Sequence, residues 1–235
     1  MKFFYSIFFF VIAFFACFSQ TDERVLNLDE TDSLYREDQF YFGFHINLLH
    51  NLPEGINQSG LSGGIMGGFI RDMPINKRRN WAIGLGLGVS ANTYGSNLFI
   101  GKNESGEGVF QILDRDEVEY STNRFSTYIA EVPVQLRWRT STPTKSSFYR
   151  IYAGFTFGYL YHFRSRFEGN ESTLKYSSLS ELNRIRTGLH LSFGSNFVNF
   201  HIQYNFNTLF DAQIADTNTN LDFQIFKFGF IFYML

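Results

Sequence analysis

Cysteine, long apolar runs and an excess of positive charge are missing from most of this chain. The one cysteine, Cys17, lies in the N-terminal apolar stretch, so the chain after it can form neither a disulfide nor a thiolate metal site. After residue 19 the longest apolar run is Phe228–Leu235, much shorter than the roughly 20 residues of a transmembrane helix. The net charge of −2 gives no reason to expect binding to nucleic acid.

The first 19 residues read as a secretory signal peptide. Lys2 is followed by a nearly unbroken apolar segment, and Cys17-Phe18-Ser19 has the small-x-small form of a signal peptidase site. An alternative is a lipidated Cys17, although Phe14-Phe15-Ala16 fits a lipobox poorly. Residues 20–38 are acidic and polar and are expected to form a mobile periplasmic leader. The mature domain is then expected over residues 39–235.

A strict alternation of large and small residues marks the segment from Trp81 to Ser90. Its odd positions are large and apolar, whereas its even positions are Ala82, Gly84, Gly86, Gly88 and Ser90. A period of two indicates a β-strand with two different faces. Glycine is a poor strand former, so three glycines on one face require a compensating geometry. Closure of the sheet into a small barrel supplies it, because the interior of such a barrel is crowded.

The same two-faced pattern predicts eight strands along the chain. They are expected at residues 39–50, 58–71, 81–90, 124–138, 147–163, 183–194 and 198–207, with a last strand around Phe226–Phe232. Short turns follow the second, fourth and sixth strands, whereas the polar segments 92–123 and 165–182 are expected to be long loops exposed to the medium. An even strand count with this asymmetry is typical of outer-membrane barrels. We therefore expect an all-β fold, an eight-stranded antiparallel up-and-down transmembrane β-barrel.

The direction of the apolar face separates this prediction from a soluble, lipocalin-like barrel. One face of each strand is nearly free of charge, and the other carries both the glycines and the charged residues. Glycines on the charged face suit a cramped interior, which places the apolar face against lipid. Trp81, Trp138, Tyr149 and Tyr159 at the strand ends resemble the aromatic girdles of membrane barrels.

The charged face predicts a network of ion pairs inside the barrel. Glu131 is expected to pair with some of four arginines, because an unpaired buried charge is costly. These are Arg137, Arg150, Arg184 and Arg186. Side chains fill the interior of an eight-stranded barrel, so no porin activity is expected.

Four histidines on the polar faces raise the question of chemistry. His190-Leu191-Ser192 has the His-x-Ser spacing used by lipid A deacylases, but in this phase both side chains face the interior, away from a lipid substrate. His45, His162 and His201 are also expected to face inward, with no second ligand two residues away to build a metal site. The sequence therefore predicts no catalytic residue, no cofactor and no metal. A lipid-modifying enzyme is kept as an alternative.

Two segments resemble the PorT (SprT) family of Bacteroidota. They are GFIRDMPINKRRNWAIGLGLG at 68–88 and YIAEVPVQLRW at 128–138, preceded by the acidic leader. The basic turn at residues 71–80 of the first segment is the more specific part of the resemblance. In the second segment, Glu131-Val132-Pro133 has valine where the family pattern has isoleucine. The resemblance implies an outer-membrane barrel required for type IX protein secretion and, in gliding species, for surface motility. It transfers no catalytic residue.

The combined prediction is a non-enzymatic component or assembly factor of type IX secretion in the bacterial outer membrane, with both termini in the periplasm. Its expected partners are outer-membrane lipid and other secretion proteins, periplasmic or in the outer membrane. The basic turn is the expected contact, through Arg71, Asp72, Lys77, Arg78 and Arg79. Inner-leaflet phosphates or plain solvation of this turn are the alternatives. A generic structural or adhesion barrel is the other alternative function.

Overall fold

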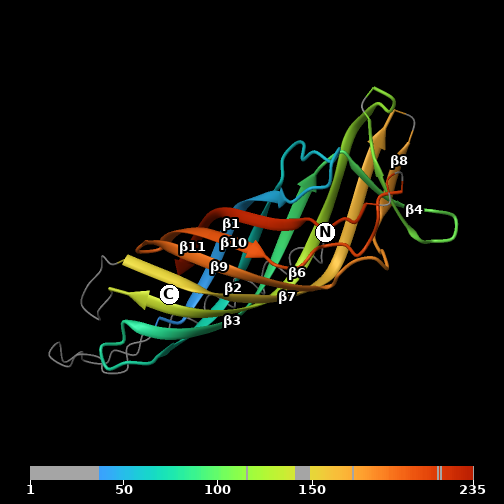
Figure 1. Ribbon diagram of the computed structural model, residues 1–235. Coiled ribbons are helices and arrows are strands. Elements are labelled where there is room, and N and C mark those ends of the chain that lie inside the picture. Colours follow the sequence, from blue (N-terminus) through green and yellow to red (C-terminus); the bar gives the residue numbers. More distant parts are fainter. Residues whose placement is uncertain are drawn as a thin grey trace, which may run out of the picture. The chain divides into compact units, whose positions relative to one another are not determined.

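The computed structural model describes residues 37–114, 116–140, 149–170, 172–215, 217 and 219–234, and within them eight strands close into an antiparallel barrel (Figure 1). The strands are β1 (Gln39–His50), β2 (Gly63–Pro74), β3 (Trp81–Gly95), β6 (Tyr120–Arg139), β7 (Tyr149–Gly169), β9 (Ile185–Ser195), β10 (Val198–Asn205) and β11 (Gln224–Met234). Each pairs with its neighbours in the chain, and β1 pairs with β11 to close the barrel. The predicted architecture is confirmed. The expected signal peptide and residues 20–36 of the leader lie outside the described residues.

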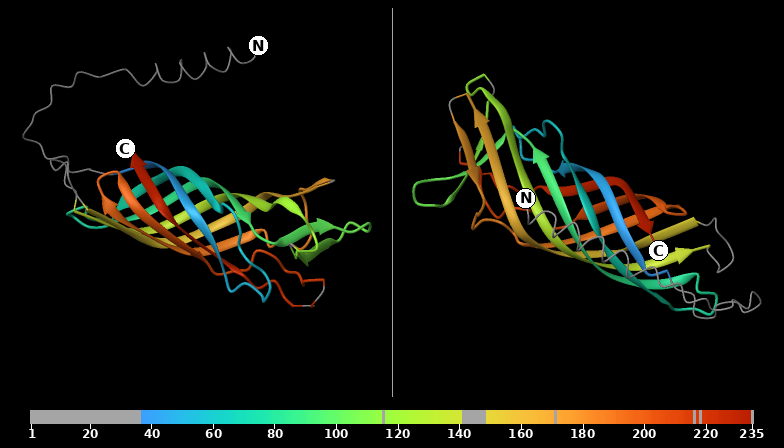
Figure 2. Two further views of the ribbon diagram at one scale, coloured as in Figure 1. Left: turned by 90° about the horizontal axis from the view of Figure 1, so that it is seen from above. Right: turned by 180° about the vertical axis from the view of Figure 1, so that it is seen from behind.

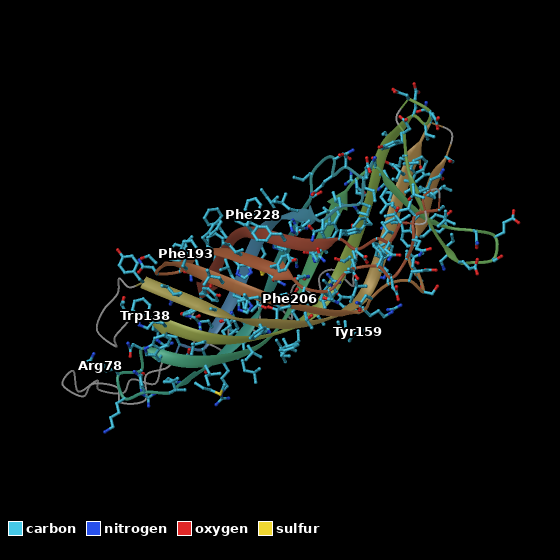
Figure 3. All side chains as sticks on the ribbon, viewed as in Figure 1. Arg78, Trp138, Tyr159, Phe193, Phe206 and Phe228 are labelled. Carbon is cyan, nitrogen blue, oxygen red and sulfur yellow. The ribbon has the colours of Figure 1, made fainter. Side chains whose placement is uncertain are left out.

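The apolar face of each strand points outward, as the alternation predicts. Along β1 the exposed side chains are Phe40, Phe42, Phe44, Ile46 and Leu48, whereas Tyr41, His45 and Asn47 are buried in the interior. The glycine-rich β2 has an ambiguous phase in the sequence; here Met66 and Ile70 point inward. Phe193 and Phe228 project from the outside of the barrel in Figure 3. Such a continuous apolar surface requires an apolar solvent around the barrel.

The glycines of β3 lie where the interior leaves no room for a side chain. A Cβ atom built on Gly84 would lie 2.7 Å from Cδ of Arg137. A Cβ atom on Gly86 would lie 2.6 Å from the carbonyl oxygen of Phe69 and 2.7 Å from Cγ1 of Ile70. Three glycines in one strand are therefore explained by close approach inside the barrel.

Aromatic side chains mark the two edges of the apolar band. At the end with the short turns, Trp81 pairs across the strands with Trp138, and Tyr149 is 67% exposed. At the other end, which we call the loop end, Tyr159 and Tyr161 are exposed on β7. This arrangement is the girdle typical of membrane barrels. Among the described residues, the structure contains no helix long and apolar enough to cross a membrane.

The prediction that residues 92–123 form a long polar loop is wrong. Most of the described part of this segment forms strands and packs against the rest of the protein. β3 continues to Gly95, β6 begins at Tyr120, and between them β4 (Leu98–Lys102) and β5 (Gly108–Ile112) form a hairpin. Leu98, Ile100 and Phe110 of this hairpin are buried. The polar residues at the hairpin tip, around Asn103–Glu107, dominate the composition and conceal these apolar positions.

The second expected loop, 165–182, is also partly regular. β7 continues to Gly169 and pairs with a short strand, β8 (Thr173–Tyr176), while Leu179 and Leu182 are buried. Together with the hairpin and the segment 209–223, these residues form an apolar cap over the loop end of the interior. Phe110, Phe125, Phe163 and Phe223 surround Phe210 in this cap, each with ring centroids 5.2–5.9 Å from it. Figure 2 shows the loops gathered at this end of the barrel.

A β-bulge in β7 changes which of its residues face outward. Tyr128 pairs with His162 but Ile129 pairs with Leu160, so Tyr161 is an extra residue in the ladder. Up to Leu160 the even-numbered residues of β7 point inward, whereas beyond the bulge His162 is exposed and Phe163 is buried. The predicted inward orientation of His162 is therefore wrong, because one inserted residue reverses the alternation.

Candidate functional site

The interior at the turn end is filled by a cluster of buried ion pairs. Arg137 Nη1 lies 2.7 Å from Asp72 Oδ1, and Arg139 Nη1 lies 2.8 Å from Asp72 Oδ2. Glu37 lies 3.2 Å from Arg150 and 3.8 Å from Arg139. The side chains of these five residues, which we call the ion-pair cluster, are at most 2% exposed. Such groups are stable in an interior only when they are paired.

Polar and aromatic neighbours complete the environment of Arg137. Its guanidinium donates to the side-chain oxygen of Gln39 and lies 4.1 Å above the ring of Tyr152. Asp38 is half-buried and accepts a hydrogen bond from the backbone amide of Asp72 at 2.8 Å. The planar arginine therefore contacts a carboxylate, an amide and an aromatic face together.

Two predictions from the sequence are corrected here. The sequence predicts that Glu37 and Asp38 belong to a mobile leader, but Glu37 is fully buried inside the barrel and takes part in the ion-pair cluster. The sequence predicts that Asp72 contacts a partner, but β2 extends to Pro74 and the Asp72 side chain lies in the interior. Asp72 lies on the same inward face of β2 as Ile70. The glycine-rich sequence of β2 leaves open which of its faces points inward, so the sequence does not predict the burial of Asp72.

The predicted ion pairs of Glu131 also differ from the observed ones. Glu131 is buried, but Oε1 lies 3.8 Å from Nζ of Lys227 and accepts a hydrogen bond from Ser90 at 2.7 Å. Arg137 and Arg150 are buried with other carboxylates, as described above. Lys227 faces the interior in the alternation of β11, which was the signal for this pair in the sequence.

The remaining two arginines of the predicted network lie apart from it. Arg186 is buried and donates a hydrogen bond to the carbonyl of Thr208 at 2.7 Å. Arg184 precedes β9 and is exposed, so its predicted place in the interior is wrong. The strand starts at Ile185, two residues later than expected, and the alternation does not reach Arg184.

Two of the interior histidines, His45 and His190, contact neutral polar groups. His190 Nδ1 lies 2.8 Å from Oγ1 of Thr156, whereas Oγ of Ser192 lies 3.4 Å from the hydroxyl of Tyr233. The two members of the alternative His-x-Ser pair thus contact different partners. His45 contacts Asn92 at 2.8 Å, and His201 is buried beside the ring of His190. Across the parts of the chain that the structure describes, no group of three or more His, Cys, Asp or Glu residues is placed to hold a metal ion.

Between the ion-pair cluster and the apolar cap the interior is lined by buried polar side chains such as Glu131, His190 and His201. A cavity of about 20 Å³ lies beside Glu131, His190 and His201, which is room for about one water molecule. Inward side chains such as Gln135, His201 and Tyr94 are at most 4% exposed, so the described interior offers no wide passage and the barrel presents surfaces instead.

The turn between β2 and β3 is the basic surface at the turn end. Asn76 builds it: its backbone carbonyl accepts from the amide of Arg79 at 3.0 Å, and its side chain contacts Asn80 at 2.6 Å. Arg79 has a positive φ of 54° and is half-buried. Lys77 and Arg78 are exposed, and Figure 3 shows Arg78 projecting from this turn. Arg71 is exposed on the outer face of β2.

Comparison with known proteins gives one family match and two matching solved structures. Residues 18–211 match a family model described as outer membrane protein beta-barrel domain. The crystal structure of Ail, the attachment invasion locus protein of Yersinia pestis, is 10% identical over 86% of this chain and 100% of that chain, with a TM-score of 0.38. The structure of Ail in complex with the heparin analogue sucrose octasulfate is 9% identical over the same shares, 86% and 100%, with a TM-score of 0.34. No curated protein matches the sequence.

Proposed function

Because the chain belongs to the family of outer membrane protein β-barrel domains, we propose that it is a non-enzymatic component or assembly factor of type IX protein secretion. The observation that carries this proposal is the filled interior. The ion-pair cluster occupies the turn end and the apolar cap covers the loop end, so transport through the barrel itself is not expected. A barrel of this kind acts through its surfaces, as an anchor or an assembly site for other proteins.

The resemblance of residues 68–88 and 128–138 to the PorT (SprT) family supports the specific role in secretion, with gliding motility where it is present. In the orientation that we expect for such an outer-membrane barrel, both termini and the short turns lie in the periplasm. The contact with the other secretion proteins is then made by the exposed cations of the basic turn, Lys77 and Arg78, with Arg79 in the same turn and Arg71 on the outer face of β2. Asp72 is not part of it, because its side chain is buried.

A deletion strain tests the secretion role. We expect it to retain cargo proteins that carry the C-terminal secretion signal, and we expect the wild-type chain to restore them to the medium. The double variant Lys77→Ala, Arg78→Ala should assemble in the outer membrane but restore secretion poorly, and pull-down from solubilised membranes should recover fewer partners. Lys102→Ala, Arg184→Ala removes two cations at the loop end and is the matched control. Normal secretion by the deletion strain would refute the proposal.

Planar-bilayer recording tests the filled interior separately. The purified protein is expected to give no large, stable conductance, since an eight-stranded barrel filled by side chains leaves no aqueous channel. Steady porin-like currents would contradict this part of the proposal without bearing on the secretion phenotype. His190→Ala and Ser192→Ala test the enzymatic alternative: unchanged lipid A in strains that carry each variant is expected.

A further inference from the structure

The strands that extend beyond the loop end carry a row of cations on their outward face. β6, β7 and β8 pair there, and the register places Arg124 opposite Arg166 and Arg166 opposite Lys175. All three side chains are exposed, and we call them the basic row. Exposed Arg164 lies on the same face of β7, opposite Ser126. Figure 1 shows β6 and β7 continuing past the other strands at this end, with β8 beside β7.

The basic row is unfavourable for the sheet by itself. Like charges directly opposite each other on neighbouring strands destabilise the pairing. Glu168 on the same face offsets part of this charge, since Nε of Arg166 donates to its Oε1 at 3.0 Å. Arg124, Arg164 and Lys175 still leave an excess of positive charge on a small area, so an anion on this surface would stabilise it.

The bulge in β7 is what directs these cations outward. Before it, the even-numbered residues from Arg150 to Leu160 alternate toward the interior. After the extra residue Tyr161, Arg164 and Arg166 are exposed, and Ser165 is buried with a hydrogen bond to the carbonyl of Ile100 at 2.7 Å. Without the bulge both arginines would point into the apolar cap. Bulges commonly re-aim side chains in this way at functional positions.

The position along β7 relates the basic row to the membrane. β7 has 21 residues, about twice the roughly 9–11 that a transmembrane strand needs. The exposed Tyr159 and Tyr161 end the apolar band, and such aromatic belts lie at the level of the lipid headgroups. Arg164 and Arg166 follow within a few residues on the outward face, which is the side that faces lipid. The groups that lie next to these arginines in the membrane are therefore lipid headgroups.

We propose that the basic row binds the phosphate groups of a phosphorylated glycolipid of the lipid A type, in the leaflet that surrounds the loop end. Guanidinium groups bind phosphate in a bidentate manner, and a lysine adds a point charge. Neighbouring strands lie about 4.8 Å apart, so three strands span about 10 Å. That width exceeds one phosphate and fits a headgroup that carries two. This inference concerns the outer face at the loop end and does not depend on the secretion role.

Native mass spectrometry of the full-length protein in detergent tests the proposal, with bis-phosphorylated lipid A as the probe. Wild-type protein is expected to bind it at least tenfold more tightly than the fully dephosphorylated lipid. Arg124→Gln, Arg166→Gln should weaken binding about tenfold, and Arg124→Lys, Arg166→Lys should keep most of it. Lys102→Gln, Arg184→Gln carries the same change of charge at the same end but outside the basic row, and should bind like the wild type. Band shifts on unheated gels show that each variant is folded.

Several outcomes would overturn the assignment. If the two glutamine double variants weakened lipid A binding equally, the effect would come from the overall charge of the protein and not from the basic row. Equal binding of phosphorylated and dephosphorylated lipid would remove the phosphates from the site. Full competition by inorganic phosphate at equal concentration would make it a site for a soluble ion, and displacement of the lipid by heparin at equal charge would point to an acidic polysaccharide. Glu168→Gln should strengthen lipid A binding, and weaker binding would count against the charge argument.

Discussion

Replacement of Asp72 by asparagine tests the ion-pair cluster most directly. The carboxylate contacts two guanidinium groups, at 2.7 Å from Arg137 and 2.8 Å from Arg139, and all three side chains are fully buried. At an effective dielectric constant of about 20, each pair of charges about 4 Å apart contributes about 4 kcal/mol. The amide keeps part of this attraction and is less costly to bury. We therefore expect a loss of about 3–5 kcal/mol in the free energy of unfolding, the usual effect of removing one partner from a buried pair.

The measurement is a urea titration of the protein refolded into lipid vesicles, followed by tryptophan fluorescence and by mobility on unheated gels. A loss of this size is a large fraction of the total stability of about 5–15 kcal/mol of a typical domain. Asp222→Asn makes the same substitution at an exposed position and should stay within about 0.5 kcal/mol of the wild type. If Asp72→Asn also stayed within that range, with an unchanged slope, the buried pairs would not stabilise the barrel and the reasoning would be refuted.

Three further predictions concern the inner face of β3, the apolar cap and the hairpin. Gly86→Ala adds a Cβ 2.6 Å from the carbonyl oxygen of Phe69 and should cost about 1–3 kcal/mol in the same titration, whereas Gly67→Ala, whose nearest atom is 3.3 Å away, should cost little. Phe210→Ala empties a 1% exposed position and should cost about 3–5 kcal/mol and expose the cap to protease; full resistance would contradict its packing. Burial raises the pKa of Glu181, but hydrogen bonds from Gly108 and Ser180 outweigh it and hold the pKa below 4.5. Glu181 therefore stabilises the folded state above pH 4.5, and this contribution is lost as the pH falls through the lower folded-state pKa. Hydrogen exchange at the Gly108 amide, which donates to Glu181 at 2.9 Å, should show this loss of protection in the wild type, whereas Glu181→Gln should show little change with pH.

The sequence pattern predicts the strands of the barrel and their outward faces well, but it predicts the contacts between interior side chains less well. Alternation is a local property, so the outward faces of β1, β3 and β11 follow from residues such as Phe42, Leu85 and Phe230. The partners of an interior charge depend instead on the stagger of strands far apart in the chain. Arg137 pairs with Asp72 from β2, and Glu131 pairs with Lys227 from the last strand. No spacing in the sequence encodes those distances.

The other differences have single local causes. One extra residue at Tyr161 reverses the face of every later residue in β7, and neither of its chain neighbours, Leu160 and His162, is a glycine or proline that would announce the bulge. In the hairpin of β4 and β5, polar tip residues conceal the buried Ile100 and Phe110. Glu37 follows an acidic, polar stretch that gives no sign of burial. Its burial depends on arginines more than 100 positions later in the chain. These features arise from tertiary structure and could not be obtained from periodicity.

The composition of the ion-pair cluster has a consequence for assembly in the membrane. Glu37 precedes the first strand, Asp72 belongs to the second, the three arginines come from β6 and β7, and the ring of Tyr233 in the last strand lies 5.9 Å and 6.0 Å from two of them. An intermediate that lacks the segment before β2 also lacks Glu37, and one that lacks the last strand lacks the aromatic ring of Tyr233 beside two of these guanidinium groups. The full environment of the arginines is therefore complete only when the first and last strands meet, which couples closure of the seam to the packing of the buried charges.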